Sequence, residues 1–390
     1  MIFNTFEYYL LFLFPAAIMF KFAARAMRPW VLIVSAGAFY IHFSLNGFGG
    51  VAGACCLTIF LWESAFSRLY RPAAWICFVG VLQSVVFLAV FKYWNYLTGL
   101  VFSLSRTNPL HWHGAFLPLG ISFFTFEFIH YAVDRYRGKT EAGALSEYLA
   151  FIMFFPTMVA GPIKRYEDFL PKLRVAEANA QDLKIGTTRI LTGLVKKFAI
   201  ADLMTAFTVH LNADDIVKAN RSTLLLWIFA YGVKIYFDFA GYSDIAIGSA
   251  RLFGLKVPEN FDWPYFRTNI SEFWRNWHIS LSSWLLDYVF IPLGGSRVAP
   301  FRIYSNLIVT MFVSGVWHGA GTNFVVWGLW HGMMLAAHRA WRTIRGAAEE
   351  SAIRDVGAGI FTFVSVNLGW AFFCMELPTA RLFFSRLIFV

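Results

Sequence analysis

Long apolar runs recur along the whole chain and constrain its fold more than any other feature. Examples are the runs from Trp75 to Phe91 and from Ile303 to Trp317. A helix that crosses the hydrocarbon core of a bilayer needs about 20 mainly apolar residues, and helices satisfy their own backbone hydrogen bonds there. Charged residues make up 14% of the chain, whereas about 25% is usual in soluble domains. The pattern excludes an ordinary soluble enzyme and predicts an all-α, polytopic membrane protein.

Several of the apolar windows are shorter than a full span. They centre near residues 12, 37, 57, 83, 123, 155, 230, 310, 328 and 365. Some contain helix-breaking residues, such as Pro15, Pro118 and Pro156. Interrupted segments are tolerated at membrane depth where protein or water satisfies the freed backbone groups. We therefore expect tilted helices and re-entrant segments among the spans.

The basic residues predict the orientation of the chain. The formal net charge is +10. Basic clusters at residues 21–28, 68–71 and 135–139 follow alternate windows, and basic loops normally lie in the cytoplasm. The next window, residues 148–161, leads to another basic cluster at 164–174. A full crossing would place that cluster outside, so a re-entrant hairpin is expected. The N-terminus is then outside, and nucleic acid is not an expected partner.

Two further regions differ from the spans. Residues 183–203 mix lysine and arginine with apolar residues at helical spacing, which predicts an interfacial amphipathic helix. Residues 254–302 are both charged and aromatic, which suits short helices at headgroup depth. Without a separate solvated region or an internal repeat, we expect one membrane domain over residues 1–390. Met1 to Phe14 lacks the basic start and the cleavage site of a secretory signal.

Ionisable residues inside apolar spans are costly and are therefore functional candidates. His318 lies in the segment FVSGVWHG at residues 312–319. A neutral imidazole there could accept a proton from an attacking hydroxyl. A histidine bonded to a neighbouring helix fits the same sequence equally well.

His278 and His331 are the next candidates. His278 lies in a segment dense in donors, acceptors and aromatic rings, where it could orient a substrate or mark headgroup depth. His331 repeats the Trp-His-Gly triplet of His318 thirteen residues later, but the two would point apart on an unbroken helix. None of the histidines has the spacing of a zinc site, so no metal is expected.

Carboxylates also fall inside the apolar spans. Asp238 and Asp244 could serve a proton pathway, but pairing with a basic loop or with Lys234 is the favoured interpretation, since Lys234 precedes Asp238 by four residues. Glu127 begins a polar stripe with His130 and Asp134 that we interpret as structural.

Six sequence blocks, in this order, resemble the membrane-bound O-acyltransferases, and specifically the branch of bacterial alginate O-acetyltransferase membrane subunits. They are residues 117–123 (LPLGISF), 155–162 (FPTMVAGP), 236–244 (YFDFAGYSD), 259–261 (ENF), 272–282 (EFWRNWHISLS) and 315–319 (GVWHG). The resemblance covers essentially the whole chain. It implies a ring of tilted helices around a buried active site reached from both sides of the membrane.

The resemblance also implies the site residues. His318 matches the family's catalytic histidine, and His278 matches the second histidine of the signature. The residues implied in substrate binding are Trp274, Arg275, Asn276, Asp238, Asn260 and Trp317. Relatives usually continue for one or two spans past the position of Val390, so the resemblance implies a short member or a piece of a longer one.

The family's chemistry implies acetyl-CoA as a cytoplasmic acyl donor, no bound cofactor, an extracytoplasmic polysaccharide acceptor such as alginate, and a periplasmic acetyltransferase partner at the inner membrane. Peptidoglycan O-acetylation and D-alanyl transfer to teichoic acid use close relatives with the same two histidines. His318 is expected to act as general base, with an acyl-histidine or direct transfer to a partner's serine as alternatives. Outside this class, a transporter or a scaffold of a polysaccharide secretion complex would also show intramembrane histidines and broken helices.

Overall fold

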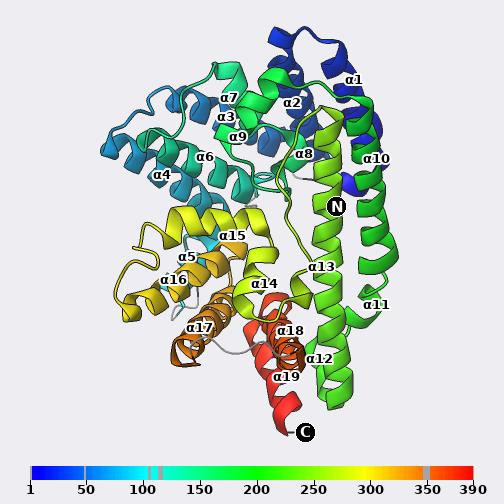
Figure 1. Cartoon of the computed structure of the whole chain (residues 1–390), viewed down its shortest axis with the longest axis vertical. Helices are drawn as coiled ribbons and strands as arrows, with labels where there is room; N and C mark the ends of the chain where they lie inside the picture. Colours follow the sequence, from blue (N-terminus) through cyan, green and yellow to red (C-terminus); the bar gives the residue numbers. More distant parts are fainter. Residues whose placement is uncertain (1, 48–49, 104–106, 113–116, 346–351, 390) are drawn as a thin grey trace. The chain divides into compact units, whose positions relative to one another are not determined.

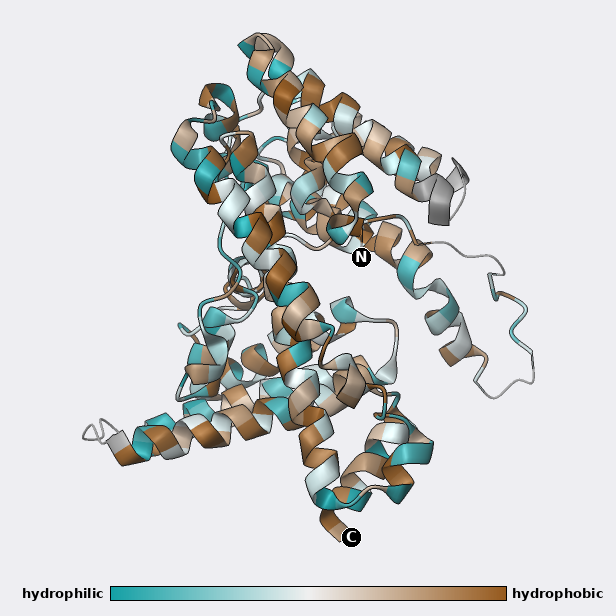
Figure 2. Ribbon diagram, turned by 90° about the vertical axis from the view of Figure 1, so that its right-hand side faces the viewer, coloured by the Kyte–Doolittle hydropathy of each residue, from teal (hydrophilic) through white to brown (hydrophobic). Residues whose placement is uncertain are grey.

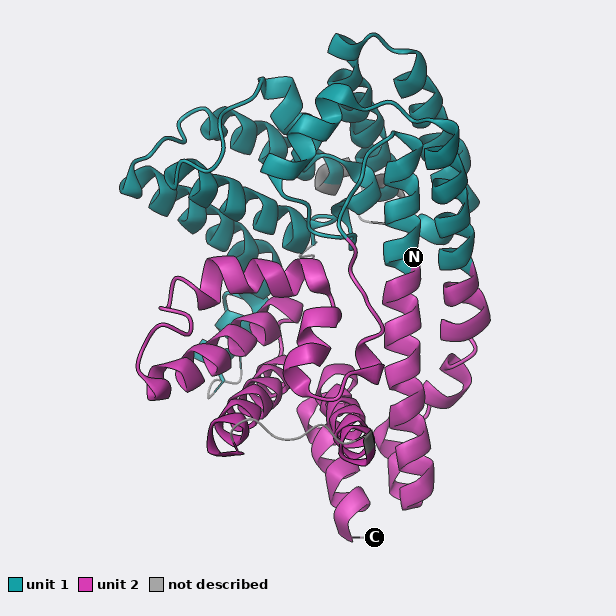
Figure 3. Cartoon of the chain, viewed as in Figure 1, with its two compact units in different colours: residues 1–194, 242–258 teal, residues 195–241, 259–390 magenta. Residues whose placement is uncertain are grey.

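The computed structural model covers the whole chain and describes every residue except 1, 48–49, 104–106, 113–116, 346–351 and 390. The described residues are helical almost throughout and contain no β-strand, which confirms the all-α prediction (Figure 1). They form two compact units, one of residues 1–194 and 242–258 and one of residues 195–241 and 259–390 (Figure 3). The single membrane domain over residues 1–390 stays a prediction.

Unit 1 holds the N-terminal helices. These are α1 (Phe14–Phe22), α2 (Arg28–Gly47), α3 (Gly50–Ser67), α4 (Ala74–Leu88), α5 (Trp94–Val101), α6 (Ile121–Tyr136), α7 (Leu145–Ile152), α8 (Phe155–Met158), α9 (Tyr166–Val175) and nearly all of α10 (Ala180–Val195). Short 3-10 or π-helical turns precede α1 and α2 and join α4 to α5.

Unit 2 holds the C-terminal helices. These are α11 (Thr205–Thr208), α12 (Ala213–Lys218), α14 (Ile270–Asn276), α15 (Ile279–Leu285), α16 (Pro300–His318), α17 (Thr322–Arg345), α18 (Ala352–Cys374) and α19 (Leu377–Phe389). The long helix α13 (Arg221–Leu252) begins in unit 2 and ends in unit 1.

Three helical segments among the described residues are long and apolar enough to cross a membrane: Ala74–Val101, Arg221–Leu252 and Ile353–Cys374. Figure 2 shows hydrophobic residues along the helices, with hydrophilic residues between them. These three segments contain the apolar windows that centre near residues 83, 230 and 365 in the sequence. The chain is accordingly a multi-pass membrane protein.

The expected short helices in the charged and aromatic region are present. After α13 the chain forms a 3-10 turn at Pro264–Phe266, then α14, α15 and a π-helical turn at Leu286–Phe290. Asn269 caps α14, because its side-chain oxygen accepts a hydrogen bond from the Glu272 backbone N–H at 3.0 Å. The amphipathic segment at residues 183–203 is also helical, as α10 and the π-helical turn Lys196–Ala201.

In unit 1 the chain enters along α7, turns through α8 and returns along α9. At the open end of this hairpin the guanidinium of Arg174 on α9 binds both carboxylate oxygens of Glu147 on α7, at 2.7 and 2.9 Å. This contact holds the pKa of Glu147 below its usual range. A return of this kind is what a re-entrant hairpin requires, although re-entry into a membrane stays a prediction.

The polar stripe on α6 lies inside unit 1. Glu127 pairs with Lys164 at 2.5 Å with both side chains buried, and Lys164 also lies over the Phe151 ring at 4.6 Å. His130 accepts a hydrogen bond from the Tyr166 backbone N–H at its Nε2. These contacts have a structural role, because each of them connects α6 to the α7–α9 hairpin.

Helices α16 and α17 approach each other through glycines. A Cβ on Gly315 would lie 2.3 Å from the carbonyl oxygen of Phe324 and 3.0 Å from the Cα of Gly328. A Cβ on Gly332 would lie 2.9 Å from the Cα of Ile308. Small residues four apart, as at Gly328 and Gly332, let helix backbones pack closely. The contact places the end of α16 against the first turns of α17.

Candidate active site

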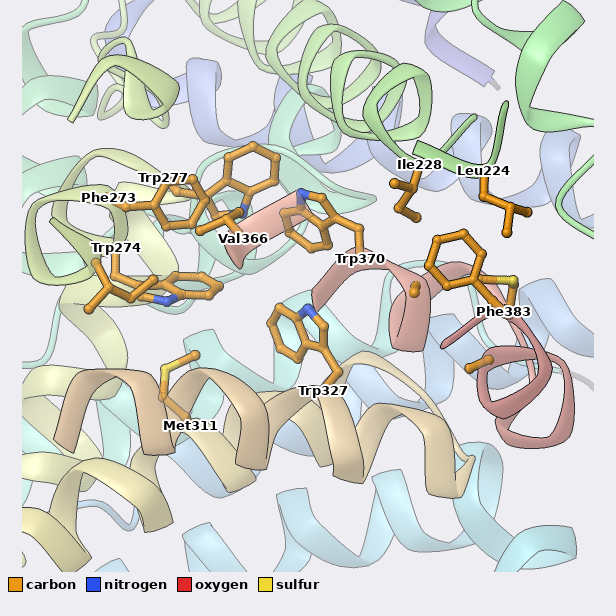
Figure 4. Close-up of a cluster of buried hydrophobic side chains, with 14 of the residues drawn as sticks. Leu224, Ile228, Phe273, Trp274, Trp277, Met311, Trp327, Val366, Trp370 and Phe383 are labelled. Carbon is orange, nitrogen blue, oxygen red and sulfur yellow. The ribbon is translucent and has the colours of Figure 1, made fainter. Parts of the chain in front are cut away.

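An aromatic cluster forms the core of unit 2 beside the predicted site. Trp274 of α14, Trp277 directly after that helix, Trp327 of α17 and Trp370 of α18 are all buried. Figure 4 shows these indoles gathered between the three helices. Trp327 stacks on Trp370 with ring centroids 5.9 Å apart. Such a cluster fixes the surrounding side chains, because buried rings of this size leave little room for movement.

His318 is the last residue of α16 and is half-buried. Its imidazole lies 4.7 Å from the Trp317 ring, 5.0 Å from Trp327 and 5.0 Å from Phe373, measured between centroids. The α16–α17 glycine contact brings Trp327 to it, and α18 brings Phe373. The ring therefore sits at an aromatic wall at the end of a helix, where it can act on a bound group as acid or base.

His278 lies between α14 and α15 with φ of 45°, a left-handed conformation that a residue other than glycine rarely adopts. Such conformations often occur at functional sites. The side chain is buried, and its ring packs edge-on against Phe239 at 4.6 Å. It is thus held rigidly by both its backbone and its packing.

Asn260 determines the proton arrangement of His278. Its Oδ1 accepts hydrogen bonds from the Ser280 backbone N–H at 3.3 Å and from the Ser280 hydroxyl at 2.7 Å, so this atom is the amide oxygen. The same oxygen lies 3.2 Å from His278 Nδ1. In the neutral ring Nδ1 is then the N–H, and Nε2 carries the lone pair. Among the described residues Nε2 has no hydrogen-bond partner.

Trp317 connects the two histidines. Its ring centroid lies 6.3 Å from that of His278 and 4.7 Å from that of His318. The structure therefore brings together four of the residues predicted from the sequence: His278, His318, Trp317 and Asn260.

His331 lies elsewhere in the same aromatic cluster. It is fully buried and packs edge-on against Trp274 and Trp327, each at 5.0 Å. Trp327 therefore contacts both His331 and His318. In the part of the chain that the structure describes, no three His, Cys, Asp or Glu side chains gather as a metal site would require.

The other predicted substrate-binding residues are more dispersed. Trp274 packs against His331, whereas Arg275 is exposed. Asn276 donates to the Glu272 carbonyl at 2.8 Å and accepts from Arg267 at 3.2 Å. These contacts give Trp274 and Asn276 packing and capping roles at α14.

The expected pairing of Lys234 with Asp238 is wrong. Asp238 instead pairs with Lys197 at 2.9 Å, and Lys234 donates to the Thr208 hydroxyl at 3.2 Å. Asp244 pairs with Arg189 at 3.1 Å. Both carboxylates thus pair with the basic segment at residues 183–203. Helical spacing allowed the Lys234 contact, but the nearer partner comes from a different helix.

Sequence reasoning missed Ser280, Phe239, Trp327 and Phe373. Ser280 lies within a quoted block, so its spacing from His278 was visible, but its bond to Asn260 was not. Phe239 also lies within one of these blocks, at residues 236–244, but its contact with His278 was not visible. Trp327 and Phe373 carry no sequence signal, because aromatic side chains are abundant throughout this chain.

Comparison with known proteins identifies the family of this chain. Residues 35–375 match the model of MBOAT, the membrane-bound O-acyltransferase family. The probable alginate O-acetylase AlgI of Pseudomonas aeruginosa is 35% identical over 386 residues, which cover 96% of this chain and 72% of that protein. The peptidoglycan O-acetyltransferase of Helicobacter pylori is 34% identical and covers 80% of this chain and 62% of that protein. The teichoic acid D-alanyltransferase of Bacillus subtilis is 32% identical and covers 74% of this chain and 75% of that protein.

A helical, multi-pass membrane protein with this match is an acyltransferase. The chain belongs to the membrane-bound O-acyltransferase family.

Proposed function

We propose that this protein moves an acetyl group from a cytoplasmic acetyl-thioester, with acetyl-CoA as the donor, toward an extracytoplasmic polysaccharide such as alginate. The observation that carries the proposal is the pair of histidines on either side of Trp317, of which His278 has an Nε2 lone pair that no described residue uses. The similarity to alginate O-acetylases over 96% of the chain supports a polysaccharide such as alginate as the acceptor.

In the proposed reaction the acceptor hydroxyl attacks the thioester carbonyl while His318 takes its proton. The C–O bond forms, the C–S bond breaks, and the thiolate leaves and takes up the proton from His318. A general base of this kind contributes about 10² to 10⁴ in rate. His278 Nε2 accepts a hydrogen bond from a neighbouring hydroxyl of the acceptor sugar and so orients the sugar, because Asn260 already holds the Nδ1 proton.

Two other routes use the same residues. The acetyl group could rest on a histidine as a covalent intermediate, or it could pass directly to a serine of a periplasmic acetyltransferase partner. We place the protein in the inner membrane, where the thioester is available on one side and the polysaccharide on the other. Membership of an acyltransferase family favours this reading over a transporter or scaffold.

The test is the content of ester-linked acetate and D-alanine on surface polysaccharide, peptidoglycan and teichoic acid of host cells. Cells lacking their own copy would carry the wild type, His318→Ala or His278→Ala at matched membrane abundance. We expect His318→Ala to lower one ester by at least about 100-fold. The polymer that loses its ester identifies the acceptor, so loss from peptidoglycan or of D-alanine would replace the alginate proposal.

His42→Gln is the matched control, since His42 lies in unit 1 and contacts Glu7 at its half-exposed ring. It should leave the esters at the wild-type level. If His318→Ala also leaves every ester unchanged at full abundance, the catalytic role of His318 is wrong.

A further inference from the structure

Unit 2 also contains an apolar groove, and its lining residues have no role in the proposed reaction. It has a volume of about 720 Å³ and runs between α13, the turn at residues 263–268 and α18. Its walls are almost entirely apolar, and they include Tyr236, Phe237 and Phe363. The volume lies within the range of about 300 to 1,000 Å³ that is usual for small-molecule sites.

The groove opens on a surface that we expect to face the hydrocarbon core of the membrane. Two of its walls, α13 and α18, are helices long and apolar enough to cross a membrane. The lining side chains of Phe266, Val356 and Ile360 are 77%, 63% and 61% exposed. Apolar surface of this kind on membrane spans is covered by lipid chains rather than by water.

One end of the groove is charged. Asp355, in the first turn of α18, is the only ionisable lining residue apart from the tyrosines. Phe363 lies eight residues further along the helix, which is about 12 Å at the helical rise. The groove thus has an anionic end where a membrane span begins and an apolar end deeper along it. An amphiphile with a cationic head and a hydrocarbon tail is complementary to this arrangement.

Trp263 at the groove has a strained backbone. Its φ is 43°, and the indole is 65% exposed although it lines the groove. A left-handed conformation is unfavourable for tryptophan and persists only where the surrounding structure holds it. Exposed tryptophans are typical of the interface between headgroups and hydrocarbon, and an indole face attracts an ammonium group.

One residue that lines the groove also contacts the aromatic cluster beside the candidate active site. Tyr265, which lines it, donates to the Gly232 carbonyl at 2.8 Å and accepts from the Trp370 indole at 3.1 Å. Its ring lies 5.7 Å from that of Trp277, the residue before His278. An occupant would therefore pack against the same aromatic layer that holds His278.

We propose that this groove is a lipid site that binds one acyl chain of an amine-headed phospholipid, with the ammonium group at Asp355 and the chain along Phe363. The proposal concerns binding, and it stands whether or not His318 is the catalytic base.

Two glycines of α18 provide a matched test. A Cβ on Gly359, which lines the groove, would meet nothing within 4 Å, and neither would one on Gly357, which does not line it. Gly359→Leu adds a side chain at the groove from a Cβ position that is open, and Gly357→Leu adds the same side chain two residues away. Replacing glycine with leucine favours the helix at both positions.

The full chain, purified in detergent and stripped of lipid, would be titrated with phosphatidylethanolamine or phosphatidylglycerol and the bound lipid counted by native mass spectrometry. We expect the wild type and Gly357→Leu to bind phosphatidylethanolamine about tenfold better than phosphatidylglycerol, and Gly359→Leu to bind it about tenfold more weakly. Asp355→Asn should abolish the preference between the two headgroups. Equal binding by Gly359→Leu and wild type, or equal loss in both leucine variants, overturns the proposal.

A second measurement does not depend on any variant. Wild-type protein would be photolabelled with phosphatidylethanolamine carrying a diazirine in its acyl chain. Labelled peptides from residues 233–237, 263–268 or 355–363 support the site. Labelling that leaves all three segments unmodified overturns it.

Discussion

Asn260 is the residue on which the arrangement of the candidate site depends. Its amide oxygen takes two hydrogen bonds from Ser280 and faces the Nδ1 of His278. The backbone of His278 is strained, so the ring would not adopt this position without such contacts. One buried amide therefore determines which nitrogen of the neutral His278 ring carries the proton and which carries the lone pair.

We predict that Asn260→Leu lowers both stability and acyl transfer. Leucine is similar in size but accepts no hydrogen bond, so the Ser280 and His278 donors lose their acceptor at a cost of about 1 to 3 kcal/mol each. Thermal unfolding of the purified protein and the acyl-transfer rate measure the two effects.

Asn260→Asp is the companion variant, because it keeps an acceptor oxygen for the same donors. We expect it to retain transfer at high pH. The acidic limb of its pH–rate profile should move to higher pH, since a carboxylate at Nδ1 favours the protonated imidazole of His278, whose Nε2 can no longer accept a hydrogen bond. An unshifted profile with full activity would contradict the role assigned to His278 Nε2.

At the scale of elements, the glycine contact between α16 and α17 positions His318. Gly315 lies one helical turn before His318, and Gly328 lies next to Trp327, whose ring contacts the imidazole. A change in the distance between the helices would move the two rings apart. Gly315 and Gly328 therefore allow the two helices to pack closely and also position the His318 ring against Trp327.

We predict that Gly315→Val disrupts this contact. The added Cβ would meet the Phe324 backbone, which cannot move as a side chain can, and overpacking typically costs about 1 to 3 kcal/mol. The melting temperature should fall, and acyl transfer should fall with it. Gly357→Ala on α18 is the control, because its Cβ meets nothing within 4 Å. A Gly315→Val protein as stable as the wild type would show that the helices can separate freely.

At the scale of the whole molecule, the basic loops predict how the chain crosses the membrane. Arg135 donates to the carbonyl oxygens of Thr140 and Tyr70, each at 2.9 Å, so the loops at residues 68–71 and 135–140 meet within unit 1. Arg174 and Glu147 likewise meet at the open end of the α7–α9 hairpin. Both contacts agree with loops that lie on one side of a membrane.

We predict that Arg71, Lys139 and Glu177 all face the cytoplasm. Each would be replaced singly by cysteine after the four native cysteines are changed to serine, and intact cells would be treated with a membrane-impermeant maleimide. All three cysteines should react only after the membrane is made permeable. Reaction of Glu177→Cys from outside would mean that the segment at residues 148–161 crosses the membrane completely.

The sequence by itself determined the class of this protein and the positions of its helices, and it predicted the two candidate histidines, His278 and His318. The lengths of apolar runs and the spacing of motifs are local properties, so they can be read along the chain. Only the tertiary structure decided that Asp238 pairs with Lys197, that Asn260 orients His278, and that Trp327 contacts both His318 and His331. These contacts join residues from different helices, and which helix faces meet depends on how side chains pack in three dimensions.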